Sequence, residues 1–151
     1  MDADRELIAA LRATGRRVTT PRLLVHRRLR AANRHVTAEQ LYDELAAEVP
    51  SLSAATVYDT LDLLDELGLI RRVSTPRGAT TYDSRTDDHH HMICRACGRV
   101  QDVEADVDVT PAELVAMTAG FAVGFAQLTL SGLCSECSGG SPADGPQRRC
   151  N

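Results

Sequence analysis

The sequence predicts an α+β protein in which a helical first half is followed by a second half of mixed strands and helix. Apolar residues recur at helical spacing as far as Gly68. Beyond Gly68 the repeat shortens to two residues, the period of a β-strand. Two Cys-x-x-Cys pairs, at Cys94 and Cys97 and at Cys134 and Cys137, lie in this second half and favour a small metal-stabilised domain there.

Four amphipathic helices are expected in the first half, over residues 4–13, 20–32, 37–49 and 53–67. The second should begin at Thr20 and Pro21, a cap residue followed by a proline in the first turn. The third opens with the capping-box pattern of Thr37 and Gln40. Gly68 should end the fourth helix, because glycine is the usual residue after a helix C-terminus.

A β-hairpin is expected next, from LIRRVS at 69–74 and ATTYDS at 79–84, with a turn at Pro76-Arg77-Gly78. Helices followed by one basic hairpin predict a winged helix-turn-helix domain over residues 1–82. In that architecture the last helix, here residues 53–67, enters the DNA major groove and the hairpin lies beside the backbone.

The second domain is expected to span residues 83–137. It should contain strands at HHHMIC (89–94), RVQDVE (99–104) and FAVGFAQLTL (121–130), with a helix that begins at Thr110 and Pro111. Residues 138–151 are rich in Gly, Pro and Ser and have almost nothing to bury, so we expect a disordered tail.

Composition limits the possible environments and partners. The 151 residues are 43% hydrophobic with net charge −4, which suits one compact domain or two small ones. No run of 18 apolar residues and no secretory signal pattern is present, so we expect a cytoplasmic protein. Residues 1–37 carry nine arginines against three acidic residues. This basic end is either a surface that contacts a phosphate backbone or an ordinary solvated helix face.

The two cysteine pairs predict a structural zinc site. Four thiolates from two Cys-x-x-Cys turns can form the closed tetrahedron that zinc prefers. The alternative is two unrelated pairs of buried or reactive cysteines. A thioredoxin-like redox motif is disfavoured, because it needs one pair at a strand-to-helix junction.

The three consecutive histidines raise the question of a second metal. On a strand, His89 and His91 project from the same face, whereas His90 points the other way. Asp83, Asp102 and Glu104 are the carboxylates nearest in sequence. Imidazole with carboxylate oxygen suits ferrous iron, manganese, nickel or zinc. The alternative is a solvated turn in which the histidines bind nothing.

Several motifs together resemble the ferric uptake regulator superfamily of bacterial metal- and peroxide-responsive repressors, over about residues 5–138. They are RVTTPR (17–22), HVTAEQLY (35–42), SAATVYDTLDLLDELGLI (53–70), TYDSRTDDHHHMICRACGRVQDVE (81–104) and LCSEC (133–137). The resemblance implies a homodimer that binds an inverted-repeat DNA operator, with residues 83–137 as the metal-binding dimerisation domain. Such a protein is a transcriptional repressor and not an enzyme.

The resemblance also implies residue roles. Structural Zn(II) is assigned to Cys94, Cys97, Cys134 and Cys137. A regulatory site for Fe(II) or Mn(II), with Zn(II) or Ni(II) as alternatives, is assigned to His35, Asp83, His89, His91 and Asp102. Contacts to DNA are assigned to Arg17, Arg22, Ser53, Thr56 and Tyr58. Asp59 departs from the relatives, which commonly have Arg or Asn there; a carboxylate can accept a hydrogen bond from a cytosine amino group.

The whole pattern is similar to the actinobacterial members that accompany catalase genes, and aspartate at both carboxylate positions, Asp83 and Asp102, is similar to the peroxide-responsive members. In these, iron-catalysed oxidation of a regulatory-site histidine releases the repressor from DNA. The alternative within the family is a metal-uptake regulator with iron, zinc, nickel or manganese as corepressor. Outside it, a zinc deaminase would need His-x-Glu and Pro-Cys-x-x-Cys motifs, and neither is present. A plain zinc-ribbon interaction module would leave the basic winged helix without a role.

Overall fold

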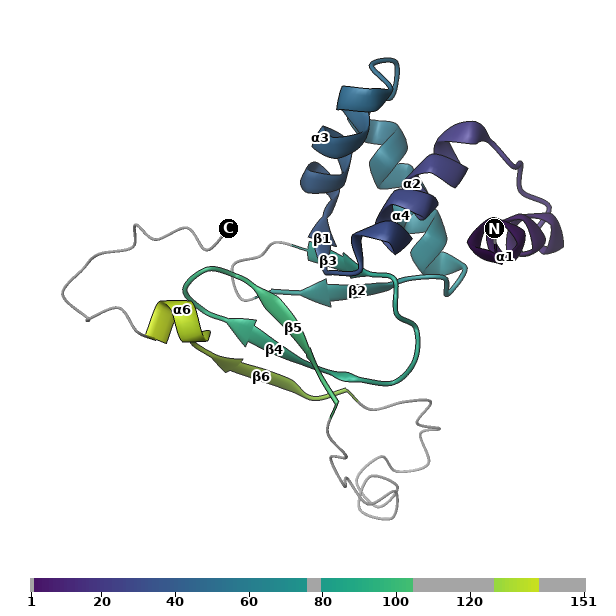
Figure 1. The fold of residues 1–151 in the computed structure, drawn as a ribbon. Coiled ribbons are helices and arrows are strands. Elements are labelled where there is room, and N and C mark those ends of the chain that lie inside the picture. The colour runs from purple at the N-terminus through teal and green to yellow at the C-terminus, as the bar shows by residue number, and fades with distance from the viewer. Residues whose placement is uncertain (1, 76–79, 105–126, 139–151) are drawn as a thin grey trace, which may run out of the picture. The chain divides into compact units, whose positions relative to one another are not determined.

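A computed structural model of the chain describes residues 2–75, 80–104 and 127–138 (Figure 1). The chain separates into two compact units, residues 1–86 (unit 1) and 87–151 (unit 2), and each is considered by itself. Asp83 therefore belongs to unit 1, as the last residue of a strand.

Unit 1 begins with four helices, as the apolar periodicity predicts. They are α1 (Asp2–Ala13), α2 (Thr20–Ala32), α3 (Ala38–Glu48) and α4 (Ala54–Glu66). Their apolar faces form one core, to which α4 contributes Val57, Leu61 and Leu64, all 0% exposed. The helices are thus held by burial of their apolar faces, the main source of helix stability in a folded protein.

The helix ends follow the local signals with one exception. Thr37 and Gln40 form the predicted capping box: the Gln40 N–H donates to Thr37 Oγ1 at 3.2 Å, and the Thr37 N–H donates to Gln40 Oε1 at 3.0 Å. The prediction that Thr20 caps α2 was wrong. Thr19 is the N-cap residue, without a side-chain hydrogen bond, and Thr20 already lies in the first turn with Pro21. Proline has no N–H, so the first turn of α2 has one fewer donor without a partner. A capping hydroxyl is therefore less needed there.

The sheet of unit 1 has the strand order β1-β3-β2. Strands β2 (Arg71–Ser74) and β3 (Thr80–Asp83) are antiparallel, which confirms the predicted hairpin, although its turn at 76–79 lies outside the described residues. Strand β1 (Val36–Thr37) was not predicted. It pairs antiparallel with β3, opposite Thr81 and Tyr82, and attaches the hairpin to the start of α3.

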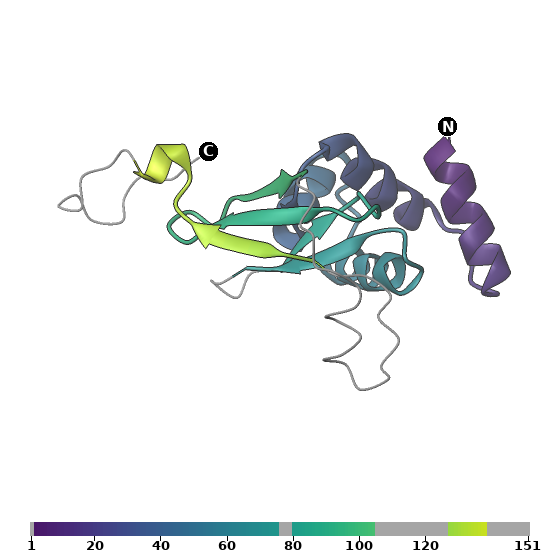
Figure 2. The same cartoon turned by 90° about the horizontal axis from the view of Figure 1, so that it is seen from below.

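Unit 2 contains β4 (His90–Cys94), β5 (Val100–Val103), β6 (Thr129–Gly132) and the short helix α6 (Ser135–Ser138). The sheet order is β5-β4-β6, with β5 antiparallel and β6 parallel to β4 (Figure 2). The helix expected from Thr110, the first part of the strand expected over 121–130, and the tail after Ser138 lie outside the described residues. The predicted α+β class, a winged helix-turn-helix followed by a small domain with clustered cysteines, is confirmed.

Within the described ranges, no helix has both the length and the apolar character needed to span a bilayer.

Candidate metal centres and nucleic-acid interface

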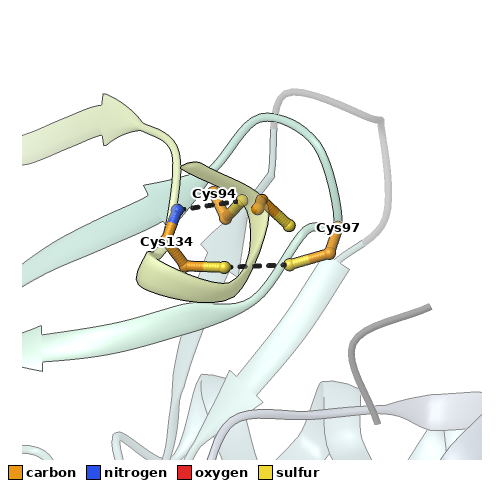
Figure 3. A group of neighbouring side chains, drawn as sticks. Cys94, Cys97 and Cys134 are labelled. Atoms are coloured by element: carbon orange, nitrogen blue, oxygen red, sulfur yellow. Dashed lines mark hydrogen bonds between the residues drawn. The ribbon is translucent and has the colours of Figure 1, made fainter. Parts of the chain in front are cut away.

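The four paired cysteines come together in unit 2, and Figure 3 shows Cys94, Cys97 and Cys134 of this group. One sulfur from each of Cys94, Cys97, Cys134 and Cys137 lies within 4.8 Å of all the others, and none forms a disulfide. Cys94 ends β4, Cys97 follows it in a turn, and the second pair follows β6. Because β6 runs parallel to β4, with Gly132 opposite Cys94, both Cys-x-x-Cys turns start at the same end of the sheet.

Backbone amides prepare these thiols to bind a cation. Burial raises the pKa of the Cys94 thiol, but backbone hydrogen bonds from Cys134, Cys97 and Ala96 outweigh burial and lower that pKa to about 6. The Cys134 N–H lies 3.3 Å from Cys94 Sγ. A backbone hydrogen bond from Cys137 lowers the pKa of the Cys134 thiol in the same way. Four clustered sulfurs, with the thiolate form favoured at Cys94 and Cys134, fit a closed zinc site.

A second set of donors lies at the other end of β4. The Nε2 atoms of His89 and His91 are 3.0 Å apart, and Asp102 Oδ1 is 3.8 Å from the first and 3.9 Å from the second. The register brings this set together, because His91 lies directly opposite Asp102 in the β4–β5 pair. His89 is 4% exposed and His91 0% exposed. Two converging imidazoles beside a carboxylate are a typical arrangement for a divalent cation.

The histidine rings are oriented by their second nitrogens. His89 Nδ1 lies 2.9 Å from the carbonyl oxygen of Asp87, so Nδ1–H can donate there and leave the Nε2 lone pair for a metal. Gln127, which no sequence pattern indicated, places its side-chain amide 2.9 Å from His91 Nδ1. The ring of His90 points elsewhere, and its Nδ1 accepts the Leu128 N–H at 3.2 Å. The predicted alternation along this strand is confirmed.

Unit 1 holds a smaller donor pair. His35 Nε2 lies 3.5 Å from Asp83 Oδ2, and these side chains are 7% and 6% exposed. They are 48 residues apart in sequence, and the β1–β3 pairing brings them together, because Val36 is opposite Tyr82 and the next pair outward is His35 with Asp83. The two-residue strand that does this is too short for any periodicity to reveal. Spacing alone therefore did not identify His35, and only the family resemblance did.

The N-cap and first turns of α4 carry three of the five side chains proposed to contact DNA, Ser53, Thr56 and Tyr58. Ser53 is the N-cap, and its Oγ accepts the Thr56 N–H at 3.2 Å. Tyr58 is 41% exposed, so its ring and hydroxyl are accessible to a partner. An N-terminus capped by small hydroxyl residues leaves room for close approach to a base or phosphate.

Most arginines of the basic N-terminal segment are neutralised within unit 1. Arg16, Arg27, Arg28, Arg30 and Arg34 each form an ion pair with an Asp or Glu. In contrast, Arg17 and Arg22 contact no carboxylate in the described part of the chain; Arg22 donates instead to the carbonyl oxygen of Arg17. The number of arginines therefore overstates the positive charge available to bind phosphate. Arg17 and Arg22, both predicted to contact DNA, are among the arginines that remain available for it.

Comparisons with known proteins agree with this arrangement. The family model described as "Ferric uptake regulator family" matches residues 13–131. A peroxide operon regulator of Bacillus subtilis is 33% identical over 134 residues, which are 89% of this chain and 92% of that protein. The solved structure of the Vibrio cholerae ferric uptake regulator is 30% identical, with a TM-score of 0.68 over 83% of this chain and 98% of that one.

The structure of a Campylobacter jejuni peroxide stress regulator is 28% identical, with a TM-score of 0.66, and the match covers 89% of this chain and 97% of that one. The family model covers most of the chain, and the Bacillus relative matches nearly from end to end. The resemblance seen in the sequence motifs is thereby confirmed: the chain belongs to the ferric uptake regulator family.

Proposed function

We propose that this chain is a metal-dependent, DNA-binding transcriptional repressor that works in the cytoplasm and responds to peroxide through its histidine donors. Members of its family are transcription regulators rather than enzymes, and they act as dimers on operator DNA. The finer proposal is that a symmetric dimer binds an inverted repeat. A twofold protein places two copies of α4 on two half-sites of opposite orientation.

The observation that carries the proposal is the donor set of His89, His91 and Asp102. Burying the two imidazoles beside a partly exposed carboxylate is costly unless a bound cation or hydrogen bonds compensate. The Asp87 carbonyl accepts from His89 Nδ1–H and leaves Nε2 available as a ligand, as carbonyls behind metal-binding histidines do. We assign these residues to a regulatory Fe(II) or Mn(II), the hard-to-borderline cations that nitrogen and oxygen donors suit.

We further propose that His35 and Asp83 of unit 1 bind the same cation. Each unit then supplies part of one ligand set, so occupancy limits the range of angles between the units. Restricting that angle selects the spacing of the two α4 helices that matches the operator. A tenfold gain in DNA affinity needs only about 1.4 kcal/mol of preference for the competent form.

Peroxide is the proposed signal because both carboxylate donors are aspartates and because the Bacillus and Campylobacter relatives are named for peroxide. Ferrous iron, if bound there, would supply the redox chemistry with peroxide by which an imidazole ligand becomes oxidised. His89 and His35 are the proposed targets. An oxidised ring is a poorer ligand, so the units regain their freedom and the chain leaves the operator.

The four cysteines are proposed to hold structural Zn(II). The described residues of unit 2 bury Ile93 and Cys94 beside the cysteine cluster, so the end of β4 lies against the proposed zinc. Metal binding can contribute folding free energy there, as it does in other small domains.

The test loads the purified protein in turn with Fe(II), Mn(II), Zn(II) or Ni(II) and measures operator binding before and after dilute peroxide. Release from the iron form alone supports the proposal. Trypsin cleaves after arginine and should yield a peptide of residues 86–95, which contains His89, and a peptide of residues 35–71, which contains His35. After peroxide treatment of the iron form, mass spectrometry should find an added oxygen atom in one of these two peptides.

The alternative function is a metal-uptake regulator, favoured by the 30% identity to the Vibrio ferric uptake regulator. Operator binding that depends on one metal and persists after peroxide supports that alternative. No added oxygen in either peptide after release would exclude histidine oxidation as the sensing reaction.

A further inference from the structure

We infer that Asp59 is a base-reading residue whose carboxylate accepts a hydrogen bond from the exocyclic amino group of a cytosine in the operator. This inference rests on the proposed DNA-binding function and adds a base preference to it. It is carried by the position of Asp59 on α4 and by the partners of the other acidic residues on that helix.

Asp59 lies on the exposed side of α4. Ala55, Tyr58, Asp59 and Asp62 are all exposed, whereas Val57, Thr60 and Leu61 between them are buried. Positions 55, 58, 59 and 62 are separated by three and four residues, so they form one continuous stripe along the helix. A recognition helix presents such a stripe to the base edges, chiefly through its N-terminal turns, and Asp59 is in the second turn of α4.

The other acidic residues of α4 are engaged within unit 1. Asp62 contacts Arg72 at 2.5 Å, Asp65 contacts Arg72 at 2.8 Å, and Glu66 contacts Arg16 at 2.7 Å. Asp59 has no hydrogen bond or ion pair to any residue that the structure describes. It is therefore the carboxylate on this face whose acceptor capacity is left for a partner outside the chain.

An available carboxylate in the major groove must find a donor, because phosphates on both sides repel it. An ionised aspartate only accepts hydrogen bonds. In the major groove guanine and thymine present acceptors, which repel it. Adenine presents its N6 amino donor beside the N7 acceptor, whereas cytosine presents its N4 amino donor without an acceptor of its own. Cytosine is thus the base that a carboxylate distinguishes best.

The side chain should also lower affinity for all other sequences. Where no cytosine faces Asp59, the repulsion from phosphate is uncompensated, so the same carboxylate disfavours non-operator DNA. This is specificity through a penalty on wrong partners as well as a contact with the right one. Removing it should weaken discrimination and strengthen nonspecific binding, two opposite effects that a purely structural role would not produce.

The experiment selects binding sites from a library of randomised DNA duplexes with the full-length, metal-loaded protein. For the wild type we expect one position in each half-site at which cytosine is preferred. Asp59→Ala should lose that preference by about fivefold, the lower end for one base contact, and bind random DNA more tightly. Asp59→Asn should move the preference towards adenine, whose N6 and N7 groups suit an amide.

Asp62→Asn is the matched control. It neutralises an exposed carboxylate one turn further along the same stripe, and this carboxylate is paired with Arg72. It should keep the cytosine preference of the wild type. If Asp59→Ala selects the same sites as the wild type with the same preferences, the inference is overturned while the proposed repressor function stands. A wild-type chain that selects no sequence at all overturns the proposed function and this inference with it.

Discussion

His26 should make unit 1 less stable in mild acid. The side chain lies on α2 with 0% exposure, and neither ring nitrogen has a hydrogen-bond partner within the described residues. Burial lowers the pKa of His26 below its usual 6.5; Arg30 lowers the pKa further, while Glu6 and Asp4 act weakly in the opposite direction. A neutral imidazole is thus favoured in the folded protein.

The sign of the pH effect follows from proton linkage. Below about pH 6.5 the unfolded chain binds a proton at His26 that the folded chain does not, so stability is lost as the pH falls from that value towards the lower folded pKa. If the folded imidazole stays neutral, lowering the pH from about 7.5 to about 5.5 costs at most about 1.4 kcal/mol from this one group. That is a large share of the stability of a small domain.

The assay is urea unfolding of the full-length, zinc-saturated chain, followed by the helical circular dichroism signal across this pH range. His26→Leu should remove up to about 1.4 kcal/mol of the pH dependence. It should also be about 1 kcal/mol more stable near neutral pH, because two buried nitrogens without partners are replaced by an apolar side chain of similar size. His26→Gln should flatten the pH dependence equally without that gain. His90→Gln, which changes a partly exposed histidine of β4, should behave as the wild type does. Equal pH dependence in the wild type and His26→Leu would refute the reasoning.

Three further predictions concern the other features. Arg17→Ala should reduce the slope of log DNA affinity against log salt concentration by about 1. The guanidinium of Arg28 is paired with Glu48, so Arg28→Ala should leave that slope unchanged. Equal effects of the two substitutions would contradict the distinction between paired and available arginines. Thr37→Ala should lower the unfolding free energy by about 1 kcal/mol in denaturant titration, because it removes one half of a capping box, and a change near zero would contradict this. Zinc chelation should abolish hydrogen-exchange protection of β4 and β6 but leave that of α2 and α4, and unaltered protection in both units would count against a structural zinc.

Much of unit 1 could be predicted because its signals are local. The capping box at Thr37, the apolar stripe of α4 and the change of period after Gly68 each lie within a few residues, and the structure has the expected elements at those places. The misassigned cap of α2 is a one-residue error between neighbouring threonines. Both could serve as caps from the sequence alone, and the backbone places Thr19 outside the helix.

The non-local pairings could not be predicted from periodicity. Strand β1 has two residues, and the parallel pairing of β6 with β4 joins segments 38 residues apart, with His91 opposite Thr129. These pairings decide which side chains meet: the first joins His35 to Asp83, and the second brings Gln127 to His91. The paired cysteines were an easier case, since the Cys-x-x-Cys spacing itself specifies the chemistry.

The most direct test of the account is the coordination shell of the regulatory cation. X-ray absorption of the manganese-loaded, zinc-saturated protein should show one imidazole fewer in His35→Ala than in the wild type, with a matching loss of manganese-dependent operator binding, while His90→Ala should change neither. If His35→Ala keeps the wild-type shell and the wild-type response of DNA binding to manganese, then unit 1 provides no histidine to the metal, and the account is contradicted.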